Sequence, residues 1–73
     1  MTAPEIKQWI ESGLPGAEAQ VEGEDGAHFQ AVVTCPGFAN KSTLEQHRMV
    51  YETLGGKMQS AIHALSLRTL VPK

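Results

Sequence analysis

The stretch AEAQVEGEDGAHFQAVVT, residues 17–34, decides the fold of this chain. In its first part alanine and valine alternate with glutamate and glutamine, which is the period of a half-buried strand. The Asp25-Gly26 pair tolerates the positive φ angles of a tight hairpin turn. Alternation resumes in a second strand, predicted over His28–Thr34, so the two strands should pair antiparallel. The predicted inward-facing residues are Ala17, Ala19, Val21, Phe29, Ala31 and Val33.

Two helices are predicted on either side of this hairpin. A Thr or Ser followed three positions later by Glu forms a capping box, and the chain has two, which begin at Thr2 and Ser42. They predict helices over residues 3–12 and 43–54, the second ended by Gly55-Gly56. In the second helix the side chains of Leu44, Arg48, Tyr51 and Leu54 share one line, flanked by Met49 and Val50.

The remainder predicts a short helix over Lys57–Ile62 and a third strand over His63–Val71, closed by Pro72. The order is therefore αββααβ, an α+β fold. A three-stranded sheet with helices on one face meets the layering requirement for one small domain spanning residues 1–73. The residues assigned to the core outside the hairpin are Trp9, Met49, Leu54, Met58 and Ile62.

Composition narrows the classes of function. The 73 residues include six Lys and Arg against eight acids, for a net charge of −2. Acids gather within residues 18–25, so one hairpin end should be negative and should repel DNA. The chain has no apolar run of bilayer length and no signal-peptide pattern at its start. A lone Cys35 suits a reducing compartment. We therefore expect a cytoplasmic protein, and no catalytic arrangement indicates an enzyme.

Several motifs together resemble the BolA family. They are Phe38-Ala39-Asn40-Lys41-Ser42, Gln46-His47-Arg48-Met49-Val50-Tyr51, Ile62-His63-Ala64-Leu65-Ser66-Leu67, and His28-Phe29 at the start of the second strand. The resemblance covers nearly the whole chain. It implies an αββααβ fold similar to type II KH domains without their Gly-rich nucleic-acid loop. Family members usually have Gly where Asn40 stands, and Asn is the residue that best replaces Gly at positive φ.

The resemblance also implies a function without catalysis: partnership with a monothiol glutaredoxin, and with its glutathione, in [2Fe-2S] cluster binding, assembly or trafficking and in iron homeostasis. The pair would share the cluster, and the chain would be a monomer without it. A His near the start of the third strand is a family ligand, and this position falls on His63. The second ligand belongs near the hairpin, where Asp25 and His28 are the candidates. Carboxylate oxygen is a hard donor that suits such a cluster poorly, so His28 is preferred.

Each candidate also has a simpler interpretation. His63 would be a half-buried residue bonded to a backbone carbonyl, His28 an exposed strand residue, and Cys35 an inert loop thiol. His47 and Arg48, with Lys41 nearby, would form a solvated helix face, contact nucleic acid, or bind a carboxylate of a partner or of glutathione. The alternative function is therefore a BolA-type transcriptional regulator that binds DNA through the KH-like fold and the helix at 43–54, with Lys41, Arg48, Lys57 and Arg68 as a local basic patch.

Overall fold

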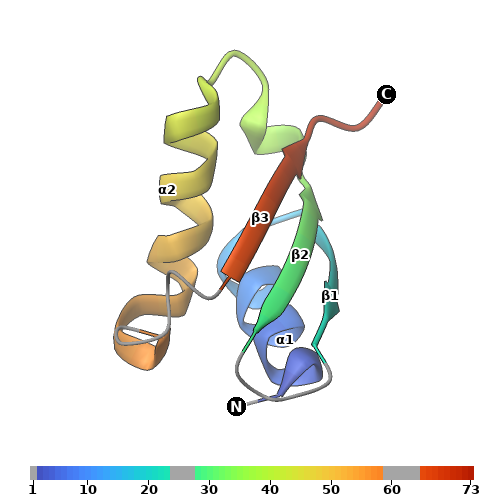
Figure 1. Ribbon diagram of the computed structural model, residues 1–73. Helices are drawn as coiled ribbons and strands as arrows, with labels where there is room; N and C mark the ends of the chain where they lie inside the picture. Colours follow the sequence, from blue (N-terminus) through green and yellow to red (C-terminus); the bar gives the residue numbers. More distant parts are fainter. Residues whose placement is uncertain (1, 24–27, 59–64) are drawn as a thin grey trace.

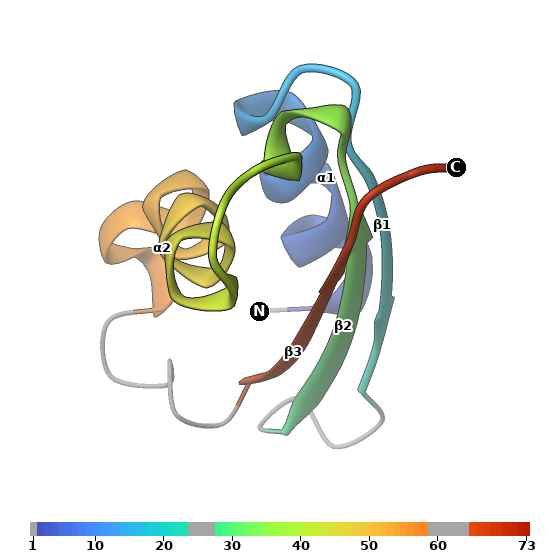
Figure 2. The ribbon, with the colours of Figure 1, turned by 90° about the horizontal axis from the view of Figure 1, so that it is seen from above.

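The computed structural model describes residues 2–23, 28–58 and 65–73. Two helices and a three-stranded sheet form two layers, and both helices lie on the same face of the sheet (Figures 1 and 2). This is the predicted α+β architecture. The elements in chain order are α1 (Ala3–Gly13), β1 (Glu18–Glu22), β2 (Phe29–Thr34), the 3₁₀ turn η1 (Pro36–Phe38), α2 (Thr43–Leu54), the 3₁₀ turn η2 (Gly55–Met58) and β3 (Leu65–Leu70).

The strand order is β1-β2-β3, so β2 is central. β1 pairs with β2 antiparallel, with Ala19 opposite Val33. β3 runs parallel to β2, and its first residue, Leu65, lies opposite Phe29. A parallel pair needs a long crossover connection, which the chain supplies through α2. The sequence predicted the antiparallel hairpin and a third strand at an edge, and both predictions are confirmed.

Both predicted capping boxes are present. The Thr2 hydroxyl accepts from the backbone N–H of Glu5, and Ser42 does the same for Glu45 at 3.1 Å. α2 ends at Leu54, where Gly55 takes a φ of 53°. Asn40 has a φ of 65°, the expected left-handed conformation, and is the one non-glycine residue with positive φ in the described part of the chain. Local chemistry therefore sets these helix ends and this turn.

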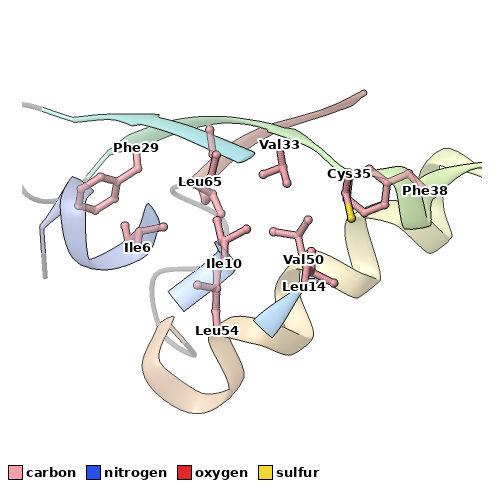
Figure 3. Packing of buried hydrophobic residues seen from close by; sticks show 12 residues of the cluster. Ile6, Ile10, Leu14, Phe29, Val33, Cys35, Phe38, Val50, Leu54 and Leu65 are labelled. Carbon is pink, nitrogen blue, oxygen red and sulfur yellow. The ribbon is translucent and has the colours of Figure 1, made fainter. Parts of the chain in front are cut away.

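The core lies between the sheet and the helices. Burial along β1 and β2 follows the predicted alternation, and Ile6, Ile10, Val50 and Leu54 meet this surface from the helix side (Figure 3). Trp9 and Met49 are partly buried against the same cluster, which confirms their packing role. Phe38, in η1, is fully buried. The two ends of the line predicted along α2 differ in burial, because Leu44 is 68% exposed whereas Leu54 is buried.

Several predicted boundaries differ from the structure, beginning with α1, which ends at Gly13 rather than Ser12. β2 begins at Phe29 rather than His28, and β3, described from Leu65, ends at Leu70 rather than Val71. The first two predicted residues of β3, His63 and Ala64, lie outside the described residues. Instead of opening a new helix, Lys57 and Met58 complete a 3₁₀ turn directly after α2. The rest of the predicted short helix, including the core assignment of Ile62, lies outside the described residues.

α1 covers the outer edge of β1 at Ala19. The Lys7 ammonium donates to the carbonyl of Ala19 at 2.9 Å, and the Glu11 carboxylate accepts from the N–H of Ala19 at 2.9 Å. Lys7 and Glu11 also form an ion pair at 2.5 Å. Side chains therefore occupy the two backbone groups that Ala19 turns away from β2, which limits strand addition at this edge.

Candidate functional site

The parallel register brings two candidate regions to the same end of the sheet. His28 immediately precedes β2, and Phe29 lies opposite Leu65, the first residue of β3. His28 is exposed, whereas Phe29 points into the core (Figure 3). The chain therefore enters β2 and β3 side by side, with an imidazole at the surface where β2 begins.

His63, the principal predicted cluster ligand, lies outside the described residues, as does Asp25. Within residues 2–23, 28–58 and 65–73, no group of three or more His, Cys, Asp or Glu side chains is placed to hold a metal ion. The assignment of His63 and His28 as ligands of a shared [2Fe-2S] cluster stays a prediction.

Cys35 occupies a packing position. Its side chain is buried in the core between β2 and η1, and its thiol lies 3.7 Å from the carbonyl oxygen of Pro15. Its backbone N–H donates to the carbonyl of Leu70 at 3.1 Å. A thiol in this setting is not presented to solvent, which agrees with the interpretation of Cys35 as an inert residue.

The other predicted contact residues lie on the outer surface of α2. His47 and Arg48 line an open hollow of about 290 Å³ together with Leu44, Tyr51 and Glu52. In this hollow Leu44 is exposed and Tyr51 is half-buried, and Arg48 and Glu52 add charges of opposite sign. Such a surface suits contact with a protein better than contact with a uniformly negative phosphate backbone.

Lys41 and Arg48 share a second shallow hollow with Glu45, Met49 and Glu52. Hydrogen bonds from the backbone N–H and the hydroxyl of Ser42 hold the pKa of the Glu45 carboxyl below its usual range, and the charges of Lys41 and Arg48 act in the same direction. Glu45 is therefore ionised at neutral pH and offsets much of the positive charge that these two residues present.

The proposed basic patch is divided between two faces of the molecule. On β3, Leu65 and Leu67 turn toward the helices, whereas Arg68 is exposed on the face that no helix covers. Lys41 and Arg48 lie on the helix side, where they line one hollow with Glu45, Met49 and Glu52 of α2. The expectation that Arg68 joins them in one patch is therefore wrong, because strand alternation sends its side chain to the opposite face.

Sequence reasoning missed the structural role of Gln46. Its side-chain amide donates to the carbonyls of Phe38 at 3.1 Å and Lys41 at 3.0 Å, and its oxygen accepts from the Thr69 hydroxyl at 2.5 Å. Gln46 thus ties the first turn of α2 to the preceding loop and to β3. It belongs to the motif that carries the family resemblance, and that was the signal that could have identified it.

Comparison with solved structures supports this fold class. The structure of a BolA protein homologue from Coxiella burnetii superposes with a TM-score of 0.86 and 53% sequence identity, over 99% of this chain and 92% of that one. A family model described as BolA-like protein matches residues 11–73. The chain belongs to the BolA-like family.

Two relatives of this chain carry names that describe different kinds of protein. SufE-like protein 1 of Arabidopsis thaliana is 35% identical over 92% of this chain, which covers 23% of that protein. The DNA-binding transcriptional regulator BolA of Escherichia coli is 36% identical over 64% of this chain, which covers 45% of that protein. The chain thus spans about a quarter of the length of the Arabidopsis relative and somewhat under half of the length of the Escherichia coli relative.

No helix in the described ranges has both the length and the apolar character needed to cross a membrane.

Proposed function

We propose that this chain acts with a monothiol glutaredoxin and its glutathione in binding or transferring a [2Fe-2S] cluster, without being an enzyme itself. Membership of the BolA-like family supports the proposal, since the resemblance implies this partnership. In the proposal, His63 and His28 contribute imidazole nitrogen and the partner contributes thiolates. Imidazole suits iron, and replacing thiolate by imidazole raises the reduction potential of such a cluster.

The observation that carries this proposal is the register between β2 and β3. Phe29 lies opposite Leu65, so the residues that lead into both strands approach the same end of the sheet. His28 is exposed there. His63 precedes Leu65 by two residues, and two residues of chain span at most about 7 Å. The proposal therefore needs no rearrangement of the sheet for both imidazoles to serve one site.

In the same proposal, the outer surface of α2 contacts the partner. Arg48 is exposed beside an apolar hollow, where its guanidinium can bind a carboxylate of the glutaredoxin or of glutathione through two hydrogen bonds. His47 lines the same hollow. Exposed Leu44 adds the apolar area that a protein interface requires.

The test is co-expression with a monothiol glutaredoxin, followed by visible absorption and circular dichroism of the purified pair. We expect His63→Ala and His28→Ala each to change the spectrum of the shared cluster toward that of the glutaredoxin alone. His47→Ala is the comparison, because a contact residue should weaken the complex without altering the iron–nitrogen bands. A mixed-cluster spectrum that His63→Ala leaves unchanged would refute the ligand assignment.

The alternative function is transcriptional regulation through DNA binding, supported by the name of the Escherichia coli relative. The divided positions of Arg68 and Arg48, and the presence of Glu45 beside Lys41, speak against a strong phosphate-binding surface. Titration of duplex DNA at two salt concentrations tests this alternative. Saturable binding at micromolar protein that weakens with added salt would support it.

A further inference from the structure

The two edges of the sheet differ in how their backbone groups are used. At the β1 edge, the N–H and C=O of Ala19 both bond to side chains of α1, through Glu11 and Lys7. This arrangement is one of the ways in which proteins block the addition of a further strand. No equivalent contact with the backbone of β3 is present in the described part of the chain.

The direction of the β3 backbone groups follows from one hydrogen bond. The carbonyl of Leu70 accepts from the N–H of Cys35, next to β2, at 3.1 Å. In a parallel pair, alternate residues of a strand bond to the neighbouring strand. The N–H and C=O groups of Leu67 and Thr69 therefore point away from β2. Among the residues that the structure describes, these outward-pointing backbone groups of Leu67 and Thr69 have no hydrogen-bond partner.

Apart from the charge of Arg68, β3 lacks the usual features that prevent strand addition. It runs for six residues, Leu65–Leu70, with one-to-one pairing to β2 and hence no bulge. It contains neither Lys nor Pro, and Figure 1 shows it as the outer strand of the sheet. An edge strand of this length that is left open is a template for pairing with another chain.

The side chains beside this edge indicate the chemistry of the occupant. Arg68 is exposed on the open face of the sheet and forms no ion pair or hydrogen bond with any described residue. Leu70, on the same face, is 42% exposed, and Val71 beyond it is 46% exposed. In an added strand, the residues across from Arg68 and Leu70 would lie on this face, two positions apart.

We propose that the outer edge of β3 binds an extended segment of a partner protein as a fourth strand, with a carboxylate across from Arg68 and an apolar residue across from Leu70. The backbone of Leu67 and Thr69 supplies the hydrogen bonds, and Arg68 supplies the preference for an acidic residue. A second copy of the chain fits less well. Two-fold pairing centred on Arg68 sets the two arginines across from each other, and directly opposed like charges are unfavourable. Two-fold pairing centred on Leu67 sets Arg68 across from Ser66, so neither register offers Arg68 a carboxylate.

The experiment uses the full chain labelled with ¹⁵N and two capped eight-residue peptides. Both peptides alternate valine and threonine, and they differ only in a central glutamate or lysine. We expect the glutamate peptide to shift the amide signals of Leu67 and Thr69 and to slow their hydrogen exchange. Its affinity should be about two- to tenfold higher than that of the lysine peptide, because the exchange turns an unfavourable cross-strand charge pair into a favourable one. Arg68→Glu should reverse this order, and it removes no contact that the described residues make.

A glutamate peptide with alternate backbone amides N-methylated is the matched control, because it keeps the side chains and loses the strand-forming donors. We expect it not to bind. Equal binding of the methylated peptide, shifts confined to other residues, no shift at millimolar peptide, or an unchanged order in Arg68→Glu would each overturn the proposal. Sedimentation that shows a dimer whose Leu67 and Thr69 amides are protected from hydrogen exchange would replace the partner segment with a second copy. None of these measurements involves the cluster or the histidines, so the proposed function stands or falls separately.

Discussion

Replacement of Gln46 by alanine should destabilise this protein more than any other substitution of a polar residue on α2. The change removes three hydrogen bonds, to Phe38, Lys41 and Thr69, which connect the first turn of α2 to its preceding loop and to β3. Each such bond contributes about 0.5–1.5 kcal/mol net, and a partly buried acceptor left without its donor costs at least as much. We therefore expect a loss of about 2–3 kcal/mol, which is a large share of the stability of so small a domain.

The measurement is urea unfolding followed by Trp9 fluorescence and by far-ultraviolet circular dichroism. In thermal unfolding of a domain of this size, a loss of about 2–3 kcal/mol corresponds to a fall in the melting temperature of roughly 10–20 °C. Gln8→Ala is the matched control, because Gln8 is an exposed glutamine on α1, and its replacement should change stability by no more than about 0.5 kcal/mol. A Gln46→Ala variant as stable as Gln8→Ala would show that the three contacts carry no net free energy.

Three further predictions concern the fold. Phe38→Ala, which empties a fully buried aromatic site, should cost about 3–5 kcal/mol and leave much of the protein unfolded at 37 °C by circular dichroism. Asn40 has a φ of 65°, which alanine adopts only at a cost and glycine adopts freely. In urea unfolding, Asn40→Ala should therefore lower the free energy of unfolding by about 1 kcal/mol, whereas Asn40→Gly should not lower it. The hydrogen bond from Lys7, followed by that from the N–H of Ala19, lowers the pKa of Glu11. The stabilising effect of the Glu11 carboxylate should therefore be complete above the ordinary glutamate pKa and decline as the pH falls through the lowered value. In Glu11→Gln, the urea midpoint should change less between pH 7 and pH 3 than it does in the parent chain.

Each of these has a clear contrary result. A Phe38→Ala variant with native-like cooperativity at 37 °C would mean that the cavity collapses. Equal midpoints for Asn40→Ala and Asn40→Gly would mean that the loop relaxes out of the left-handed conformation. A Glu11→Gln variant with the same acid sensitivity as the parent chain would mean that other carboxylates control the pH dependence.

For the candidate functional surfaces, the sequence could indicate individual residues more directly than the faces of the molecule on which those residues lie. The resemblance directed attention to His28, His47, Arg48 and His63, but the composition alone could not say which basic residues share a face. Arg68 and Arg48 each follow a regular local pattern, yet the packing of α2 on one side of the sheet separates them. Gln46 shows the same limit, since its bonds to Phe38 and Thr69 join residues 8 and 23 positions away.

What the sequence by itself determined is local. Capping boxes at Thr2 and Ser42 and the two-residue alternation of β1 and β2 depend on neighbours within a few positions, so they could be predicted without a fold. Tertiary structure alone decided that α2 buries Val50 and Leu54 while Leu44 stays exposed. It also decided that α1 covers the β1 edge at Ala19, whereas no side chain in the described ranges bonds to the backbone of β3. These outcomes depend on how whole elements pack, because burial and strand pairing are set by contacts between segments distant in the chain.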